Sequence, residues 1–175
     1  MCKFKRLVDI NSDKYIFTKY ILSIVKCYRK YLYYLQDDFL LSNTGTVTNF
    51  ILNMMPNFWV ITDYSDEFMG FVYLDNFIGC GNILYSAELT IRFDKKAWGS
   101  FTKYCAKIFL KKVFDVFGLQ KIKAQIYPDN YRIKTLLKTA GFMYESTLKK
   151  ETVRAGKVQD IEVYAIYRDY YYKTR

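Results

Sequence analysis

The segment FDKKAWGSFTKY, residues 93–104, joins an alternating apolar run to a long amphipathic stretch. Phosphate groups bind where a strand passes through a short polar loop into a helix, because the first N–H groups of a helix have no partner within it. Lys95 and Lys96 add positive charge, and Gly99 lets the backbone approach an anion closely. The segment therefore predicts an anion-binding loop. The alternative is a plain strand-to-helix turn in which Trp98 packs as core.

The strand before this loop offers one open face. In SAELTIRFD, residues 86–94, apolar positions alternate with polar ones, with Glu88, Thr90 and Arg92 on the polar side. Successive side chains of a strand point to opposite faces of a sheet. One face of this strand is therefore predicted to be core, and the face with Glu88 is free to meet a ligand.

Several kinds of catalytic site are excluded by composition. The chain has no histidine, which removes histidine metal sites, Ser-His-Asp triads and Cys-His dyads. The four cysteines form no CxxC pair and no zinc spacing, so no metal is predicted. Cys27 and Cys105 are expected on buried helix faces, and all four thiols are expected to be reduced.

The net charge of +10 favours an anionic partner, such as nucleic acid, a phosphorylated cofactor or an acidic protein surface. A solvated lysine-rich surface encoded by an AT-rich genome is the alternative. The N-terminus is too polar for a signal peptide, and no apolar run reaches the length of about 20 residues that crosses a bilayer. We expect a cytoplasmic protein with no membrane partner.

The 175 residues, 51% of them hydrophobic, suffice for one domain with a substantial core, and no linker or repeat is visible. Hydrophobic periodicity predicts the order β α α β β β α β α β β. The expected strands are 4–10, 58–64, 67–77, 86–94, 121–127, 144–153 and 161–168. The first expected helix follows NSD at 11–13. Three more helices are expected at 46–55, at 101–118 and between Pro128 and Gly141. FIGCGN (77–82) is predicted to be a turn, and DYYYKTR (169–175) a polar-aromatic tail. Strands on both sides of a strand-helix-strand crossover indicate an α/β or α+β sheet.

Three segments in this order resemble the GNAT superfamily of acyl-CoA-dependent N-acetyltransferases. They are FGLQKIKAQIYPDN, LLKTAGF and AGKVQDIEVYAI, and with their surroundings they span about residues 85–167. The resemblance looks closest to the branch that acetylates the N-termini of ribosomal proteins. It implies one domain over residues 1–175, with a twisted, mostly antiparallel sheet, a central parallel splay and helices on both faces.

The resemblance also implies where acetyl-CoA would lie. The pantetheine arm would occupy the splay between AELTIRF and KIKAQIY, and the pyrophosphate would sit on the loop that opens the long helix. The residues implied in cofactor binding are Ile91, Phe93, Lys95, Lys96, Trp98, Gly99, Ser100, Phe101, Thr102 and Asn130. In the family this loop has more small residues than AWGSF provides, because either Trp98 or Phe101 falls on a small position. For Asn130, capping of the following helix is a second reading.

For catalysis, the resemblance implies direct transfer to a neutral amine, whose proton a carboxylate can accept directly or through water. Glu88 is the candidate base, with a salt bridge to Arg92 or a lysine as the alternative. Tyr164 on the closing strand is a weaker candidate, and as one of 18 tyrosines it is also open to a packing role. The tyrosine that many relatives have in the helix after Asn130 is replaced here by Leu137.

The acceptor is left open by the sequence. A protein N-terminus, a lysine or a small amine would fit the family, and the positive charge adds a protein or ribonucleoprotein partner as an option. A catalytically silent GNAT-fold protein used for binding or assembly, in a virus or mobile element, is the alternative function. RNA binding through lysines and tyrosines is a third reading, without a recognisable motif. A homodimer also stays open.

Overall fold

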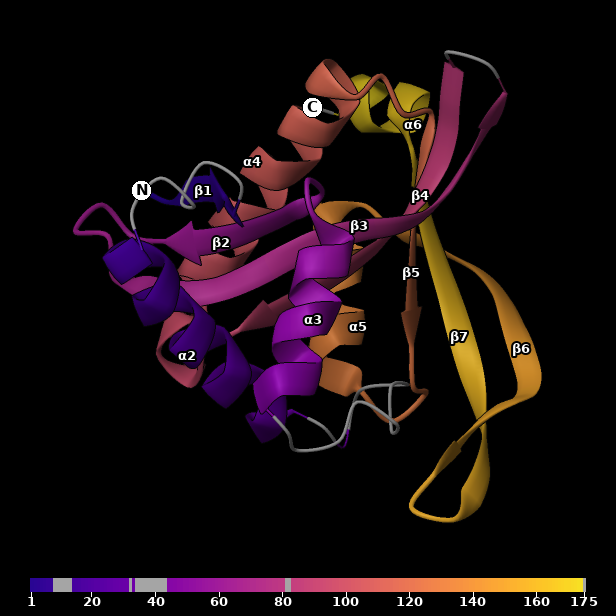
Figure 1. Cartoon of the computed structure of the whole chain (residues 1–175). Coiled ribbons are helices and arrows are strands. Elements are labelled where there is room, and N and C mark those ends of the chain that lie inside the picture. The colour runs from indigo at the N-terminus through magenta and orange to yellow at the C-terminus, as the bar shows by residue number, and fades with distance from the viewer. Residues whose placement is uncertain (8–13, 32, 34–43, 81–82, 175) are drawn as a thin grey trace. The chain divides into compact units, whose positions relative to one another are not determined.

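The computed structural model describes residues 1–7, 14–31, 33, 44–80 and 83–174, and Figure 1 labels its elements. The chain divides into two compact units. The first unit comprises Met1–Leu74 and Thr90–Thr102, and the second comprises Asp75–Leu89 and Lys103–Arg175.

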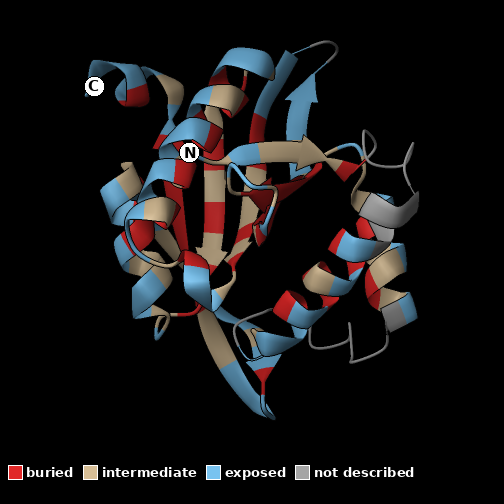
Figure 2. Ribbon diagram, turned by 90° about the vertical axis from the view of Figure 1, so that its left-hand side faces the viewer, coloured by how far each residue is buried: buried red, intermediate tan, exposed pale blue. Residues whose placement is uncertain are grey.

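The first unit has two helices, α2 (Lys14–Lys30) and α3 (Thr44–Met54), which lie side by side in Figure 1. Their apolar residues recur every three or four positions, so one side of each helix is buried and the other is exposed, as Figure 2 shows. The buried side chains of α2 and α3 join those of the neighbouring strands in one core. This core includes Ile21, Ile24, Tyr28, Val47, Ile51, Phe58, Val60, Phe71 and Tyr73.

Three strands of the first unit pair in an antiparallel manner. They are β1 (Lys3–Arg6), β2 (Phe58–Thr62) and the first part of β3 (Phe68–Cys80). Phe4 lies opposite Ile61, and Val60 lies opposite Phe71. The strands predicted at 58–64 and 67–77 are therefore confirmed, and they pair as a hairpin.

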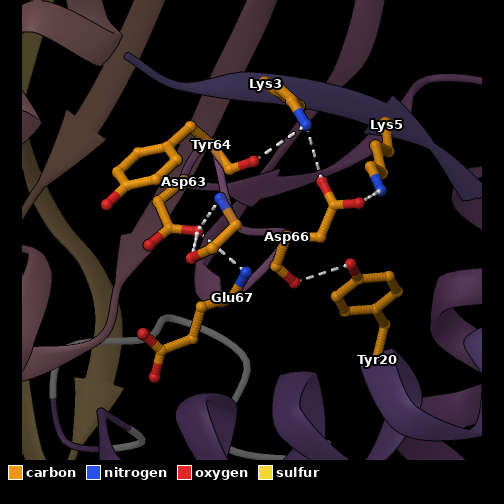
Figure 3. A network of polar contacts seen from close by, with 8 residues as sticks. Lys3, Lys5, Tyr20, Asp63, Tyr64, Asp66 and Glu67 are labelled. Atoms are coloured by element: carbon orange, nitrogen blue, oxygen red, sulfur yellow. Dashed lines mark hydrogen bonds and ion pairs between the residues drawn. The ribbon is translucent and has the colours of Figure 1, made fainter.

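Polar side chains contribute to the turn between β2 and β3, beside backbone hydrogen bonds such as the one from Asp63 N–H to the Glu67 carbonyl at 3.1 Å. Asp63 Oδ1 accepts hydrogen bonds from the backbone N–H groups of Ser65 and Glu67, both at 2.9 Å. Asp66 pairs with Lys3 and Lys5 of β1, each at 3.0 Å, as Figure 3 shows. These contacts fasten the N-terminal strand to the turn.

The predicted turn at FIGCGN is wrong for its first four residues. β3 continues to Cys80, and β4 (Ile83–Phe93) starts earlier than predicted. Both strands approach closely at Gly79, where an added Cβ would lie 2.3 Å from the carbonyl oxygen of Ile83. Glycine content indicated a loop, whereas here it permits close pairing of two strands.

The second unit is built around a strand-helix-strand crossover. The helix α4 (Ser100–Val116), which begins in the first unit, leads to β5 (Lys121–Ile126), and α5 (Tyr131–Ala140) follows β5. β4 and β5 are parallel, and three residue pairs join them, from Ser86↔Lys121 to Glu88↔Lys123. The predicted buried side of α4 is confirmed at Phe109, Leu110, Val113 and Phe114.

The chain closes with a long hairpin, β6 (Met143–Arg154) and β7 (Lys157–Tyr167), in which β7 also pairs with β5. In the described residues the strand order is β1-β2-β3-β4-β5-β7-β6, with one parallel pair and otherwise antiparallel pairs where the registers are given. This mixed sheet confirms the predicted fold class.

The predicted tail is wrong in one respect, because Arg168–Lys173 form a short helix, α6. Tyr171 is 2% exposed, and its ring centroid lies 5.1 Å from that of Phe114 on α4. The adjacent rings of Tyr171 and Tyr172 both contact Phe114, which holds this segment against α4. Some predicted positions lie outside the described residues. They are the start of the first helix at 11–13, the end of the first strand at 8–10, and Leu32 and Leu35 in the first helix.

Candidate active site

The loop after β4 begins with a single turn of 3-10 helix, η2 (Lys95–Ala97). Asp94 starts this turn, since its Oδ1 accepts a hydrogen bond from the backbone N–H of Lys96 at 3.3 Å. The N–H of Asp94 donates to the carbonyl of Met69 at 2.8 Å. The end of β4 is thus fixed before the chain turns into α4.

Trp98 is partly buried and contacts two neighbouring aromatic residues. Its ring meets Phe93 edge-on at a centroid distance of 6.1 Å, and its Nε1–H donates to the hydroxyl of Tyr31 at 3.4 Å. An edge-on aromatic pair contributes about 0.5–1.5 kcal/mol beyond its buried area. The predicted packing of Trp98 is therefore present, and it does not exclude a ligand at the next residue.

Gly99 fits a close approach by a phosphorylated ligand. Its φ is +118°, and no heavy atom lies within 4 Å of the Cβ position. Its carbonyl accepts a hydrogen bond from Thr102 Oγ1 at 2.8 Å, which fixes the first turn of α4. Ser100 is exposed and Phe101 is partly buried. Open space beside the first N–H groups of a long helix is suited to a pyrophosphate.

The two lysines of the loop differ in their surroundings. Lys95 is exposed, whereas Lys96 forms an ion pair with Glu67. Ile91 and Phe93, also predicted to contact the cofactor, are 9% and 1% exposed. A ligand contact by these two residues would therefore use their backbone groups rather than their side chains.

Glu88 contacts three polar side chains of the second unit. Its Oε1 accepts a hydrogen bond from Gln125 Nε2 at 2.9 Å, and its Oε2 accepts one from Asn76 Nδ2 at 2.9 Å. Lys123 Nζ lies 3.7 Å from Oε1. The salt bridge with a lysine that the sequence left open is therefore present, and the Glu88 side chain remains 18% exposed.

The two predicted catalytic residues lie on opposite faces of the sheet. Glu88 is paired with Lys123, and Tyr164 is paired with Ala124, the next residue of β5. Paired residues share a face, and successive residues of a strand alternate between faces. Glu88 and Tyr164 therefore do not converge on one substrate.

Tyr164 is a packed residue with one polar contact. It is 3% exposed, its ring meets Tyr144 edge-on, and its hydroxyl donates to Glu162 Oε2 at 3.2 Å. Burial, with the nearby Glu162 carboxylate, raises the pKa of Tyr164 above its ordinary value. The hydroxyl thus stays protonated at neutral pH. Lys134 of α5 pairs with Glu162 at 2.8 Å, so this cluster joins α5 to β7.

Asn130 caps α5, since its Oδ1 accepts a hydrogen bond from the N–H of Ile133 at 3.4 Å. The preceding residue, Asp129, receives two hydrogen bonds from Arg154, at 3.1 and 2.8 Å. The Arg154 guanidinium also lies 4.2 Å from the ring centroid of Tyr127. The segment before α5 is therefore fixed by the end of β6, which the sequence did not indicate.

Asn76 and Gln125 were missed as members of the site. The alternation in KIKAQI places Gln125 on the polar side of β5, on the face of Glu88, so a signal existed for it. The sequence had no such signal for Asn76. This residue lies within β3 with a φ of +45°, and strand periodicity does not predict a positive φ.

Other kinds of site find no support in the described residues. No group of His, Cys, Asp or Glu in that part of the chain could hold a metal ion. Within the same residues, none of the helices combines the length and apolar character that crossing a bilayer requires. Cys27 and Cys105 are buried, as predicted, and the four cysteines, all within the described residues, form no disulfide.

A family model of the acetyltransferase (GNAT) domain matches residues 10–143 of the chain. No curated protein matches the chain. Among solved structures, the fold is similar to that of spermidine N-acetyltransferase from Vibrio cholerae in complex with CoA and spermine. That likeness has a TM-score of 0.76 and 19% identity, and covers 98% of this chain and 97% of that one.

Two further solved structures are similar. An acetyltransferase (GNAT family) from Bacillus anthracis has a TM-score of 0.72 and 16% identity, covering 96% of this chain and 94% of that one. A putative phosphinothricin N-acetyltransferase has a TM-score of 0.74 and 14% identity, covering 95% of this chain and 98% of that one. At these identities the similarity establishes the fold.

Proposed function

Because the chain belongs to the acetyltransferase (GNAT) domain family, we propose that it moves an acetyl group from acetyl-CoA to a primary amine by direct transfer. The observation that supports this most is the position of Glu88. It is the last residue of β4 that pairs with β5, and both strands continue beyond it. A partly exposed carboxylate at that point is suited to receive a proton from an amine.

In this proposal Glu88 accepts the proton of the acceptor amine, directly or through one water, so that the nitrogen lone pair is available for attack. The acetyl-CoA thioester supplies the activated acyl group. Asn76 and Gln125 each donate to a different oxygen of Glu88, which leaves further lone pairs of the carboxylate for the amine proton. Tyr164 has no role in transfer.

We place the cofactor pyrophosphate on the start of α4, near Gly99, Ser100 and Thr102. Lys95 adds positive charge, whereas the charge of Lys96 is partly balanced by Glu67. Trp98 supports the loop through Phe93 and Tyr31. Asn130 caps α5, the helix that follows β5. In this proposal Asn130 also contacts the pantetheine region of the cofactor.

For the acceptor, we propose a peptide N-terminus, a lysine or a small amine rather than a polyamine. The Vibrio cholerae protein is in complex with spermine. Here the net charge is +10, and Glu88 and Glu145 have lysine partners, Lys123 and Lys121. A polycation would have to compete with those lysines. Four further parts of the proposal rest on the sequence alone. They are ribosomal-protein N-termini as acceptors, a ribonucleoprotein partner, a homodimer and a cytoplasmic location.

The alternative function is a silent GNAT-fold protein used for binding or assembly. The bulky residues beside Gly99 favour it, since either Trp98 or Phe101 falls on a position where the family has a small residue. Titration of acetyl-CoA by calorimetry separates the two functions. An acetyltransferase should bind acetyl-CoA. If millimolar acetyl-CoA gave neither heat nor a shift in melting temperature, the enzymatic function would be excluded.

The catalytic test uses Glu88→Gln, with Glu151→Gln at an exposed position of the same unit as the matched control. The Glu88 variant should lower kcat by about 10²–10⁴-fold, the range for loss of a general base, while acetyl-CoA affinity stays within about two-fold. The control should match the wild type for peptides and small amines. Unchanged turnover in Glu88→Gln would exclude Glu88 as the base.

A further inference from the structure

The Glu88 carboxylate is held from two strands at once. Asn76 of β3 donates to Oε2 and Gln125 of β5 donates to Oε1, each at 2.9 Å. We propose that these two amides are positioning residues, which fix the orientation of Glu88 toward the acceptor amine. This inference rests on the proposed acetyltransferase function. We call the two side chains the amide clamp.

The backbone of Asn76 supports a dedicated role. Its φ of +45° is a left-handed conformation that few residues other than glycine adopt, although asparagine tolerates it better than most. Such a residue interrupts the regular alternation of a strand, so the side-chain direction at this position is set locally. Here it brings the amide to Glu88 of the neighbouring strand.

Gln125 reaches Glu88 from the other side. Glu88 pairs with Lys123, and Gln125 is two residues further along β5, on the same face. In the described residues the parallel pairing of β4 with β5 ends at Glu88 and Lys123, so the side chain of Gln125 joins the strands where backbone pairing ends. The hydrogen bond therefore continues the contact between β4 and β5 at the position of the base.

The chemistry of amides suits this task. An amide NH₂ donates hydrogen bonds without titrating, so the clamp does not take a proton from the amine or change with pH. A carboxylate has about four lone-pair positions, of which the two amides use two. Lys123, 3.7 Å away, balances the charge. Fixed orientation of a catalytic group lowers the cost of reaching the transition state.

The first test removes each amide separately. Asn76→Gly deletes the side chain and tolerates the positive φ, and Gln125→Ala deletes the other amide. Each should lower kcat by about 5–30-fold, with the KM for acetyl-CoA within about two-fold, because the clamp acts through the base. Gln120→Ala, an exposed amide of the same unit, is the control and should match the wild type. Wild-type kcat in both clamp variants would overturn the inference.

The second test exchanges the two groups of one hydrogen bond. The double variant Glu88→Gln with Gln125→Glu keeps an amide and a carboxylate facing each other beside Lys123. If Gln125 and Glu88 face each other in the folded protein, the exchange should restore the melting temperature relative to Gln125→Glu alone. kcat should stay at the level of Glu88→Gln, because position 88 then has no carboxylate. A melting temperature that is not restored would contradict the contact on which the inference rests.

A third measurement does not depend on activity. The side-chain NH₂ signals of Asn76 and Gln125 in ¹⁵N NMR spectra, assigned with the two amide deletions, should both shift in Glu88→Gln. Signals that stay in place would overturn the clamp. A wild type that neither binds acetyl-CoA nor acetylates any amine would overturn the proposed function, and with it the catalytic role of the clamp. An active wild type with active clamp variants would overturn the clamp alone.

Discussion

The backbone conformation of Gly99, and not the atoms around it, limits which residues can replace it. No heavy atom lies within 4 Å of an added Cβ, but its φ of +118° lies in a region that residues with a side chain rarely adopt. A substitution there would strain the chain and place a methyl group where we propose that the pyrophosphate lies. The other end of α4 provides a comparison, because Gly118 also has a positive φ, +65°, and open space.

We expect Gly99→Ala and Gly118→Ala each to lower the free energy of unfolding by about 1–2 kcal/mol through backbone strain. Only Gly99→Ala should weaken acetyl-CoA binding, by about ten-fold or more. Denaturant unfolding and calorimetry measure the two effects. Equal acetyl-CoA affinity in the two variants would exclude the loop at Gly99 as the binding site.

Cys27 should be inert in the folded protein. Burial, together with the nearby Asp94 carboxylate, raises the pKa of this thiol to about 12. Thiol reagents react with the thiolate, so at pH 9 only roughly one molecule in a thousand would have a reactive Cys27 in the native state. In the unfolded chain the thiol ionises at its ordinary pKa, so Cys27 favours folding below that value and loses this contribution as the pH rises toward 12.

Mass spectrometry after brief labelling at pH 9 tests this. Exposed Cys80 should be modified, whereas Cys27 should be modified only after denaturant is added. Labelling of Cys27 at the rate of Cys80 in native protein would contradict the buried position.

The positions of Gly99 and Glu88 could be anticipated at this scale because the patterns around them are local, whereas their roles in cofactor binding and catalysis stay predictions. A glycine between a strand and a helix, and a carboxylate on the polar side of a strand, are visible in short segments of sequence. The partners of Glu88 were not visible, since Asn76, Glu88 and Gln125 come from three strands. Strand registers decide which side chains meet, and they also separate Glu88 from Tyr164.

Among the elements, β1 depends on polar contacts at the turn between β2 and β3 (Figure 3). Hydrogen bonds from Lys3 and Lys5 hold the pKa of Asp66 below its ordinary value of 3.8. A lowered folded-state pKa means that the carboxylate stabilises the fold above 3.8. This contribution is lost as the pH falls through the lower folded-state value.

Asp66→Asn should therefore lower the melting temperature by about 1–3 °C at pH 7, and this difference should shrink as the pH falls below 3.8. Backbone amides of β1 should also exchange faster at pH 7. Asp115→Asn, which removes an ion pair on α4, is the control and should leave exchange in β1 unchanged. A difference between Asp66→Asn and the wild type that does not shrink with falling pH would show that the charge is not the cause.

The elements themselves were largely predictable from periodicity. Buried residues every three or four positions defined α4, and alternation defined β5, in agreement with the structure. The errors fall where another interaction decides. Gly79 allows two strands to approach rather than marking a turn, and α6 forms because Tyr171 packs on Phe114.

At the scale of the whole molecule, three elements belong to both units. β3, β4 and α4 each continue from one unit into the other, with boundaries after Leu74, Leu89 and Thr102. Unfolding one unit alone would interrupt each of these elements along its length. The prediction of a single domain, which the sequence supplied, is therefore open to a direct thermodynamic test.

We expect one cooperative unfolding transition. Cys27 and both tryptophans, Trp59 and Trp98, belong to the first unit, and Cys105 belongs to the second. Labelling of Cys27, labelling of Cys105 and tryptophan fluorescence should give the same denaturant midpoint. The exposed Cys80 is the control and should be labelled without denaturant. Separate midpoints for Cys27 and Cys105 would show two domains.

The position of Glu88 and Tyr164 on opposite faces has a consequence for genetic experiments. Substitutions around Tyr164, Glu162 and Lys134 would loosen α5 and reduce the amount of protein in a cell. On the proposed function, substitutions around Glu88 should leave the amount unchanged and reduce the output of each molecule. A growth assay would score both groups alike, so a survey of variants needs a separate measure of protein abundance to distinguish the face that packs against α5 from the face that carries the proposed base.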